Sequence, residues 1–191
     1  MSKGRRGGIR IVAGSSRGRR LIVPKVADVR PTSEMVREAI FDVLGPIGGL
    51  GVLDLFAGSG ALGIEALSRG ASRCVFVESE LQVVDVLRQN IVLLGYESAC
   101  EVLVGPYQTA SRSLAATGRQ FELFFVDPPY RMLAEVEMAL RPLVGDLLSP
   151  EGVLVIEGPR LQEVAFGLPI VFEREYGETR VTMVRSKGSD L

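Results

Sequence analysis

Residues 52–63, with the sequence VLDLFAGSGALG, constrain the fold of this chain more than any other stretch. The first five are a short apolar run with a single carboxylate, which is typical of a buried parallel strand. Gly58 and Gly60 then predict a tight turn, because glycine adopts positive φ freely and lets a ligand approach the backbone. Good helix formers follow from Ala61. The stretch therefore predicts a strand, a turn and a helix whose free N–H groups face a ligand.

The spacing Gly58-x-Gly60-x-x-Gly63 formally matches the dinucleotide-binding fingerprint. Glycines that serve only a turn and close helix packing would give the same spacing. Asp54 argues against a dinucleotide, because a carboxylate beneath the loop would repel a pyrophosphate and attract an ammonium group. The pattern Asp-x-Phe-x-Gly-x-Gly resembles the first motif of S-adenosylmethionine-dependent methyltransferases. Glu78 ends the next apolar run, where a carboxylate can accept two hydrogen bonds from a ribose diol.

Strands and helices alternate along most of the chain. A helix from Thr32 or Ser33 to about Leu44 precedes the glycine stretch, with Met35, Ala39 and residues 41–44 expected on its buried face. The predicted strands are 52–56, 74–78, 100–104, 123–127 and 153–157; the predicted helices are 61–69, 81–94, 108–116 and 133–143. Segments 169–176 and 178–185 read as an antiparallel hairpin. The pattern predicts an α/β, Rossmann-like fold with a seven-stranded, mostly parallel sheet ending in an antiparallel hairpin. Such a sheet resembles that of class I S-adenosylmethionine-dependent methyltransferases rather than the six-stranded dinucleotide-binding fold.

The N-terminal 30 residues differ in charge from the rest of the chain. They carry a net charge of +8, whereas the remainder carries −9. Segments 10–13 and 20–23 read as two strands of a β-hairpin that bears much of this charge. We therefore predict a basic N-terminal extension, residues 1–30, and a methyltransferase domain, residues 31–191. Such a basic arm indicates a polyanionic partner, although a solvated tail would have the same composition.

Composition excludes several classes of function. The chain has 191 residues, 47% of them apolar, and no histidine, which removes His-based acid–base catalysis, Ser-His-Asp triads and the common zinc sites. No stretch has the length of a signal peptide or a membrane span, and we expect no metal and no membrane association. Cys74 and Cys100 lie in apolar contexts, which indicates buried thiols in a reducing cytoplasm. We expect a cytoplasmic monomer.

Residues 121–130, with the sequence FELFFVDPPY, form the second and more specific motif. Asp127 follows an apolar strand directly and should reach the same crevice as the glycine turn, because the strands of a parallel sheet end at one edge. The Asp127 side chain and the Pro128 carbonyl would offer two acceptors for the two hydrogens of an amino group. Tyr130 offers a flat face, and stacking a base on an aromatic ring contributes about 1–3 kcal/mol. A turn that merely ends the strand is the simpler alternative.

These motifs, with the N-terminal blocks Arg10–Gly14, Arg17–Leu21 and Arg30–Thr32, closely resemble the RsmD family from about residue 10 to residue 185. Those enzymes methylate the N2 amino group of a guanine in 16S ribosomal RNA of the bacterial small subunit. The resemblance implies S-adenosylmethionine as cofactor, held by Asp54, Phe56, Gly58, Gly60, Glu78, Ser79 and Gly105. It implies Asp127, Pro128 and Tyr130 as the catalytic residues. It also implies RNA contacts by Arg10, Arg17, Arg19, Arg20, Arg30 and Arg37.

One position departs from the family pattern. The family usually carries Asp or Asn near the adenine, where this chain has Gly105-Pro106-Tyr107. Two other classes of function stay open: methylation of adenine in nucleic acid or of glutamine in a protein, and a ribosome-assembly factor that binds RNA without catalysis. The expected partner is ribosomal RNA, either within the small ribosomal subunit or in its assembly intermediate.

Overall fold

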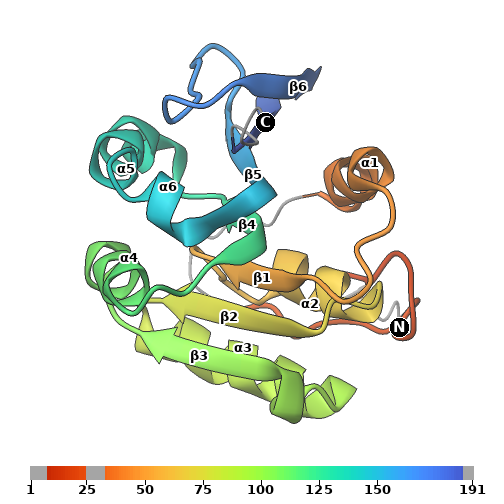
Figure 1. The fold of residues 1–191 in the computed structure, drawn as a ribbon. Coiled ribbons are helices and arrows are strands. Elements are labelled where there is room, and N and C mark those ends of the chain that lie inside the picture. The colour runs from red at the N-terminus through yellow and green to blue at the C-terminus, as the bar shows by residue number, and fades with distance from the viewer. Residues whose placement is uncertain (1–7, 25–32, 187–191) are drawn as a thin grey trace.

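The computed structural model describes residues 8–24 and 33–186, which form a central sheet between two layers of helices (Figure 1). The strands are β1 (Gly51–Asp54), β2 (Arg73–Glu78), β3 (Cys100–Val104), β4 (Phe121–Val126), β5 (Leu148–Pro159), β6 (Ile170–Tyr176) and β7 (Thr179–Arg185). Their order is β3-β2-β1-β4-β5-β7-β6, parallel from β3 to β5, with β7 antiparallel to both of its neighbours. The predicted seven-stranded sheet with its terminal hairpin is confirmed.

The helices cover both faces of the sheet, with α1 and α2 on one side of the view and α4 to α6 on the other (Figure 1). They are α1 (Glu34–Leu44), α2 (Ala61–Ser68), α3 (Leu81–Leu94), α4 (Tyr107–Ala116), α5 (Leu133–Leu140) and α6 (Val144–Leu147), with 3₁₀ turns at Glu97–Ala99 and Tyr130–Met132. Alternate strand residues serve opposite layers: Val52 belongs to the core under α1 to α3, and Leu53 to the core under α4 to α6. This alternation explains why the strands are apolar on both faces.

Helix α1 begins as predicted but presents a different face to the core. Ser33 is its N-cap and accepts a hydrogen bond from the Val36 N–H at 3.2 Å. The expected buried residue Met35 is 62% exposed, whereas Arg37 is fully buried beside Val36 and Ile40. The prediction was right for Phe41, which is buried, and wrong for Met35 and Val43, which are exposed; a buried arginine interrupts the apolar pattern.

Two boundaries on the α4–α6 side also differ from the prediction. The predicted helix 133–143 ends at Leu140, because Pro142 has no N–H to continue the helical hydrogen bonds, and α6 follows as a separate turn. Strand β5 begins at Leu148 rather than at residue 153. The earlier start lengthens β5, the strand that carries Glu157 to the carboxyl ends of the parallel strands.

The N-terminal segment 8–24 pairs with itself over a shorter length than predicted. Only one isolated antiparallel bridge, Arg10 with Arg20, is formed in the described part of this segment, flanked by the Ile11 N–H bond to the Arg19 carbonyl at 2.9 Å. The pairing is short because the Val12 and Ala13 N–H groups bond to α2 instead. Ile9, Ile11 and Leu21 are buried in the core under α1 to α3, so segment 8–24 is integrated into the domain.

The two cysteines are neighbours on adjacent strands and are both free thiols. Cys74 of β2 and Cys100 of β3 are register partners. Cys74 is buried as predicted, whereas Cys100 is only half-buried. Burial raises the pKa of Cys74 well above its usual value and that of Cys100 to about 12. Both groups are therefore protonated at neutral pH. None of the described helices has the length and apolar character needed to cross a membrane.

Candidate functional site

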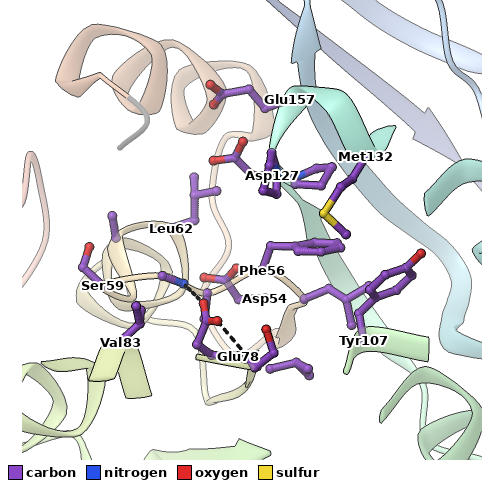
Figure 2. A pocket seen from close by; sticks show the side chains of 18 of the residues that line it. Asp54, Phe56, Ser59, Leu62, Glu78, Val83, Tyr107, Asp127, Met132 and Glu157 are labelled. Carbon is purple, nitrogen blue, oxygen red and sulfur yellow. Dashed lines mark hydrogen bonds between the residues drawn. The ribbon is translucent and has the colours of Figure 1, made fainter. Parts of the chain in front are cut away.

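A cavity of about 890 Å³ opens at the carboxyl ends of the parallel strands. Strand β1 leads to β2 on one side and pairs with β4 on the other, so the cavity lies where the chain order reverses, the usual ligand position in such sheets. Six of the seven predicted cofactor residues and all three predicted catalytic residues line it: Asp54, Phe56, Gly58, Glu78, Ser79, Gly105, Asp127, Pro128 and Tyr130. Figure 2 shows several of these side chains around one space.

The three glycines of the first motif have three different roles. Gly58 lines the cavity with φ of 54°. Gly60, with φ of 85°, is the N-cap of α2 and lies outside the cavity lining, where a Cβ would meet Leu87 at 2.6 Å. A Cβ at Gly63 would come within 2.3 Å of the Phe76 ring. Gly63 therefore serves close contact between α2 and the sheet, and only the first glycine faces the ligand space.

Glu78 organises the loops around the cofactor end of the cavity. One of its carboxylate oxygens accepts from the Gly58 N–H at 3.0 Å, and the other accepts from the Ser79 and Glu80 N–H groups at 2.7 and 3.0 Å (Figure 2). These bonds fix the orientation of the carboxylate and join β2 to the glycine turn. A carboxylate has about four lone-pair positions, so it still has capacity for ribose hydroxyls.

Asp54 lies at the floor of the cavity and is 2% exposed. Burial raises its pKa to about 7; the Gly63 N–H, 3.0 Å from its Oδ2, opposes this, and the charges of Asp127 and Glu78 add to it. A cationic ligand group beside Asp54 would stabilise the ionised form.

The cavity as a whole is acidic. Its charged lining residues are five carboxylates and one guanidinium: Asp54, Glu78, Glu80, Asp127, Glu157 and Arg131. A dinucleotide pyrophosphate would meet repulsion there, whereas a ligand with ammonium and sulfonium charges would be attracted. The residues present therefore fit S-adenosylmethionine. Within the described ranges, no group of three or more Cys, Asp or Glu side chains is arranged to hold a metal ion.

The second motif forms the opposite wall of the cavity. Asp127 and Tyr130 are half-buried, and Pro128 is buried. The Tyr130 hydroxyl is 2.6 Å from Oγ1 of Thr179, at the start of β7. This hydrogen bond ties the motif to the terminal hairpin and fixes the direction of the Tyr130 ring. Asp127 and the face of the Tyr130 ring are thus brought together on the wall opposite the glycine turn.

Two aromatic rings lie beside residues 105–107, where this chain lacks the Asp or Asn that was expected near the adenine. The Phe56 and Tyr107 rings are 5.1 Å apart between centroids and inclined by 43°. The Tyr107 hydroxyl donates to Glu135 at 3.3 Å, which directs it away from the cavity. Gly105 has φ of 145°, a conformation that suits glycine. The lining here therefore consists of the two aromatic rings, Gly105, Pro106 and Gln108, with no Asp or Asn side chain at residues 105–107.

Segment 8–24 is attached to the helix that starts at the glycine turn. Glu65 of α2 is fully buried and accepts from the Val12 and Ala13 N–H groups at 2.8 and 2.9 Å, and from Arg69 at 2.9 Å. Gly14 contacts the end of α2 so closely that a Cβ would lie 1.8 Å from the Ser68 carbonyl oxygen.

Asn90 of α3 makes a second connection, between segment 8–24 and the glycine turn. Its side chain accepts from the Ile22 N–H at 2.8 Å and donates to the Ile22 and Ser59 carbonyls at 2.9 Å. The position of segment 8–24 is thereby linked to that of the cofactor loop.

Arg30 lies outside the described residues, and none of the other five predicted RNA-binding arginines lines the cavity. Arg10, Arg17, Arg19 and Arg20 are exposed on segment 8–24. Three of these make local contacts: Arg10 with Glu34 at 3.0 Å, Arg19 with the Leu93 carbonyl, and Arg20 with the Gly8 carbonyl.

Arg37 corrects the prediction, because it is 0% exposed and donates to the Arg10 carbonyl at 2.7 Å, which is incompatible with a direct RNA contact in this structure. Burial lowers its pKa, and the charges of Glu65, Glu34 and Glu157 oppose that shift.

Sequence reasoning missed Glu157 and Asn90. Glu157 ends a predicted strand, so the rule that selected Glu78 and Asp127 at strand ends would have found it as well. Asn90 carries no local signal, since its three hydrogen bonds go to residues 31 and 68 positions away.

Known proteins resemble this chain over most of its length. A family model described as conserved hypothetical protein 95 matches residues 9–185. Ribosomal RNA small subunit methyltransferase D of Escherichia coli (strain K12) is 39% identical over 168 residues, covering 86% of this chain and 80% of that protein. The structure of a hypothetical protein of Thermus thermophilus has a TM-score of 0.80 at 34% identity, covering 93% of this chain and 99% of that one.

A more distant structure shares the fold alone. It is an RNA methyltransferase of Salinibacter ruber, in complex with S-adenosyl-L-homocysteine, with a TM-score of 0.64 at 18% identity, covering 85% of this chain and 96% of that one. The fold is that of class I S-adenosylmethionine-dependent methyltransferases. Since both the family model and the E. coli relative match most of the chain, this protein belongs to the RsmD family, described as conserved hypothetical protein 95.

Proposed function

We propose that this protein transfers a methyl group from S-adenosylmethionine to the exocyclic N2 amino group of a guanine in 16S ribosomal RNA of the small subunit. The observation that carries the proposal is the meeting of the glycine turn and the Asp127–Tyr130 motif in one acidic cavity. The 39% identity to ribosomal RNA small subunit methyltransferase D of E. coli supports the choice of substrate. The proposal implies a cytoplasmic enzyme acting on the small subunit or its assembly intermediate.

The cofactor is held by residues from three strand ends. Asp54 receives the ammonium group, and the free lone pairs of Glu78 receive the ribose hydroxyls. Gly58 allows close approach of the ligand to the backbone. Phe56 and Gly105 lie beside the adenine, whose recognition then rests on ring contact and backbone groups. Among the predicted cofactor residues, Gly60 acts indirectly, by starting α2 and shaping the turn.

The chain's own contribution to the chemistry is positioning. S-adenosylmethionine held there would supply an electrophilic methyl group, with the electrons of the carbon–sulfur bond remaining on sulfur as a neutral thioether. Asp127 and the Pro128 carbonyl accept the two N2 hydrogens, so that the nitrogen lone pair is localised and directed at the methyl carbon. Tyr130 stacks on the base that has left its helix. Asp127 then holds the positive charge on nitrogen until the surplus proton passes to water.

RNA reaches this site along segment 8–24. Arg10, Arg17, Arg19 and Arg20 are exposed there, and phosphate contacts supply most of the sequence-independent affinity for RNA. The acidic remainder of the domain repels nucleic acid, which favours approach along the basic segment.

Methyl transfer to purified substrates tests the proposal. The enzyme is incubated with methyl-tritiated S-adenosylmethionine and with RNA, DNA, protein and small subunits from a strain lacking the gene. We expect label only in 16S ribosomal RNA, as N2-methylguanine at one position located by mass spectrometry. Label in adenine or glutamine would support the alternative substrates, and binding without a single turnover would indicate an assembly factor; each result would overturn the proposal.

A further inference from the structure

Glu157 of β5 lies directly beside Asp127, which follows β4, near the carboxyl ends of these two strands. In the parallel pairing of β4 and β5, Val126 is the register partner of Ile156, so the next residues along the two strands are Asp127 and Glu157. In-register residues of neighbouring strands point to the same face, and neighbouring strands lie about 4.8 Å apart. Figure 2 shows both carboxylates extending from the same side of the sheet. Both residues line the cavity.

A buried cation stands near Glu157. Glu157 is 7% exposed, which is unusual for a carboxylate. Arg37 is fully buried, and the charge of Glu157 is one of those that oppose the lowering of its pKa by burial. This nearby positive charge reduces the cost of keeping an acidic side chain at the cavity wall. Asp127 and Glu157 therefore present two neighbouring carboxylates to the cavity.

We propose that Glu157 is the specificity-determining residue that recognises guanine, by accepting a hydrogen bond from N1–H while Asp127 and the Pro128 carbonyl accept from N2. This inference rests on the proposed function. Guanine presents N1–H next to its amino group, so its Watson–Crick edge carries adjacent donors that match adjacent acceptors. Three acceptors then satisfy all three donors of that edge.

The same pair of carboxylates disfavours the other candidate substrates. Adenine has an unprotonated N1 acceptor beside its amino group, and a glutamine side chain has a carbonyl oxygen there. Either acceptor would face the Glu157 carboxylate, which is also an acceptor, so no hydrogen bond could form between the two groups. Sites built to hydrogen-bond a donor discriminate strongly against a ligand that lacks it, because buried polar groups are then left unpaired. The juxtaposition of Asp127 and Glu157 thus selects guanine.

Base analogues at the methylated position test this role. Small-subunit RNA is ligated from synthetic fragments carrying guanine, 2,6-diaminopurine or 2-aminopurine at the position located by mass spectrometry, and is assembled into subunits. Both analogues keep the N2 amino group but have an acceptor at N1, and they differ from each other at C6. We expect the wild-type enzyme to prefer guanine by about 100-fold in kcat/KM over both analogues.

Glu157→Gln should reduce this preference at least about tenfold, because the glutamine amide can donate to the N1 acceptor. Equilibrium binding of the same subunits without cofactor should show the same change in preference. The control Glu38→Gln alters an exposed carboxylate of α1 that does not line the cavity, and it should keep the wild-type ratio. A loss of folding in Glu157→Gln would lower all activities together, whereas only a recognition role changes the ratio.

Two kinds of failure are distinguishable. If guanine is methylated but the analogues react equally well, or if Glu157→Gln keeps the wild-type preference, the role of Glu157 is refuted while the proposed function stands. If the wild-type enzyme labels no guanine in any RNA or subunit, the proposed function fails, and the role of Glu157 fails with it.

Discussion

The buried Asp54 carboxyl predicts a conflict between stability and cofactor binding. Burial raises its pKa from 3.8 to about 7. Below about pH 4 the carboxyl is protonated in both the folded and the unfolded chain, and it has no pH-dependent effect. Between about pH 4 and pH 7 only the unfolded chain loses the proton, so the free energy of unfolding falls as pH rises. Above about pH 7 the carboxyl is ionised in both states, and the free energy of unfolding no longer depends on its titration.

The size of this effect follows from the shift. About three pH units correspond to about 4 kcal/mol of unfolding free energy at most. Asp54→Asn removes the charge and keeps an oxygen that can accept from the Gly63 N–H. The cofactor-free variant should therefore melt several degrees higher than wild type at pH 8, since 1 kcal/mol shifts the melting temperature of a chain this long by about 2–4 °C. At about pH 4 the two melting temperatures should coincide.

The same substitution should weaken cofactor binding, because the ammonium group loses its carboxylate. In the wild type, affinity should rise roughly eightfold between pH 5.5 and pH 6.5, a range more than one pH unit below the titration of an ordinary α-amino group. Calorimetry in buffers of different ionisation enthalpy should detect about half a proton released per cofactor bound at pH 7. Constant affinity over this range without proton release would refute the reasoning, as would an Asp54→Asn variant with no gain in stability at pH 8.

Three further sets of substitutions test separate parts of the structure. Asp127→Ala should abolish methyl transfer while cofactor affinity, measured by calorimetry, stays within a few fold; near-normal turnover would exclude its acceptor role. Replacing Arg17, Arg19 and Arg20 together with alanine should weaken RNA binding and lower its salt slope by about 0.7–0.9 per lost phosphate contact, with cofactor binding unchanged; an unaltered slope would show that these side chains are only solvated. Asn90→Leu should lower the free energy of unfolding in urea by about 1–3 kcal/mol for each backbone group left unpaired. Asn90→Asp should lose at least as much at neutral pH, because a buried carboxylate would face the Ile22 and Ser59 carbonyls; equal stability of both variants and wild type would contradict this.

The residues that sequence reasoning located best are those at strand ends. Glu78 and Asp127 each end an apolar run, and Asp54 lies in the run just before the glycine turn. The carboxyl ends of parallel strands meet at one end of the sheet, so the sequence alone was enough to predict that these residues line one cavity. Glu157 obeys the same rule and was available to it. Pro142 likewise marked the end of α5 locally.

The remaining features depend on contacts between distant segments. Arg37 looks like a surface residue in sequence, but it is fully buried, and the negative charges of Glu34, Glu65 and Glu157 partly offset the lowering of its pKa by burial. The short pairing of segment 8–24 follows from Glu65 taking two of its N–H groups. Neither effect has a periodicity or a motif, so local patterns could not have predicted them.

The attachment of segment 8–24 to α2 also bears on the order in which parts of the chain fold. Val12 and Ala13 are bonded to Glu65, and Ala13 to Ser68, across 52 to 55 residues of chain. Synthesis proceeds from the N-terminus, so this segment leaves the ribosome before α2 exists. Contacts between such distant residues slow folding, since a long loop must close before they form. Segment 8–24, the first part of the described chain to be made, is therefore expected to be among the last to reach its native position.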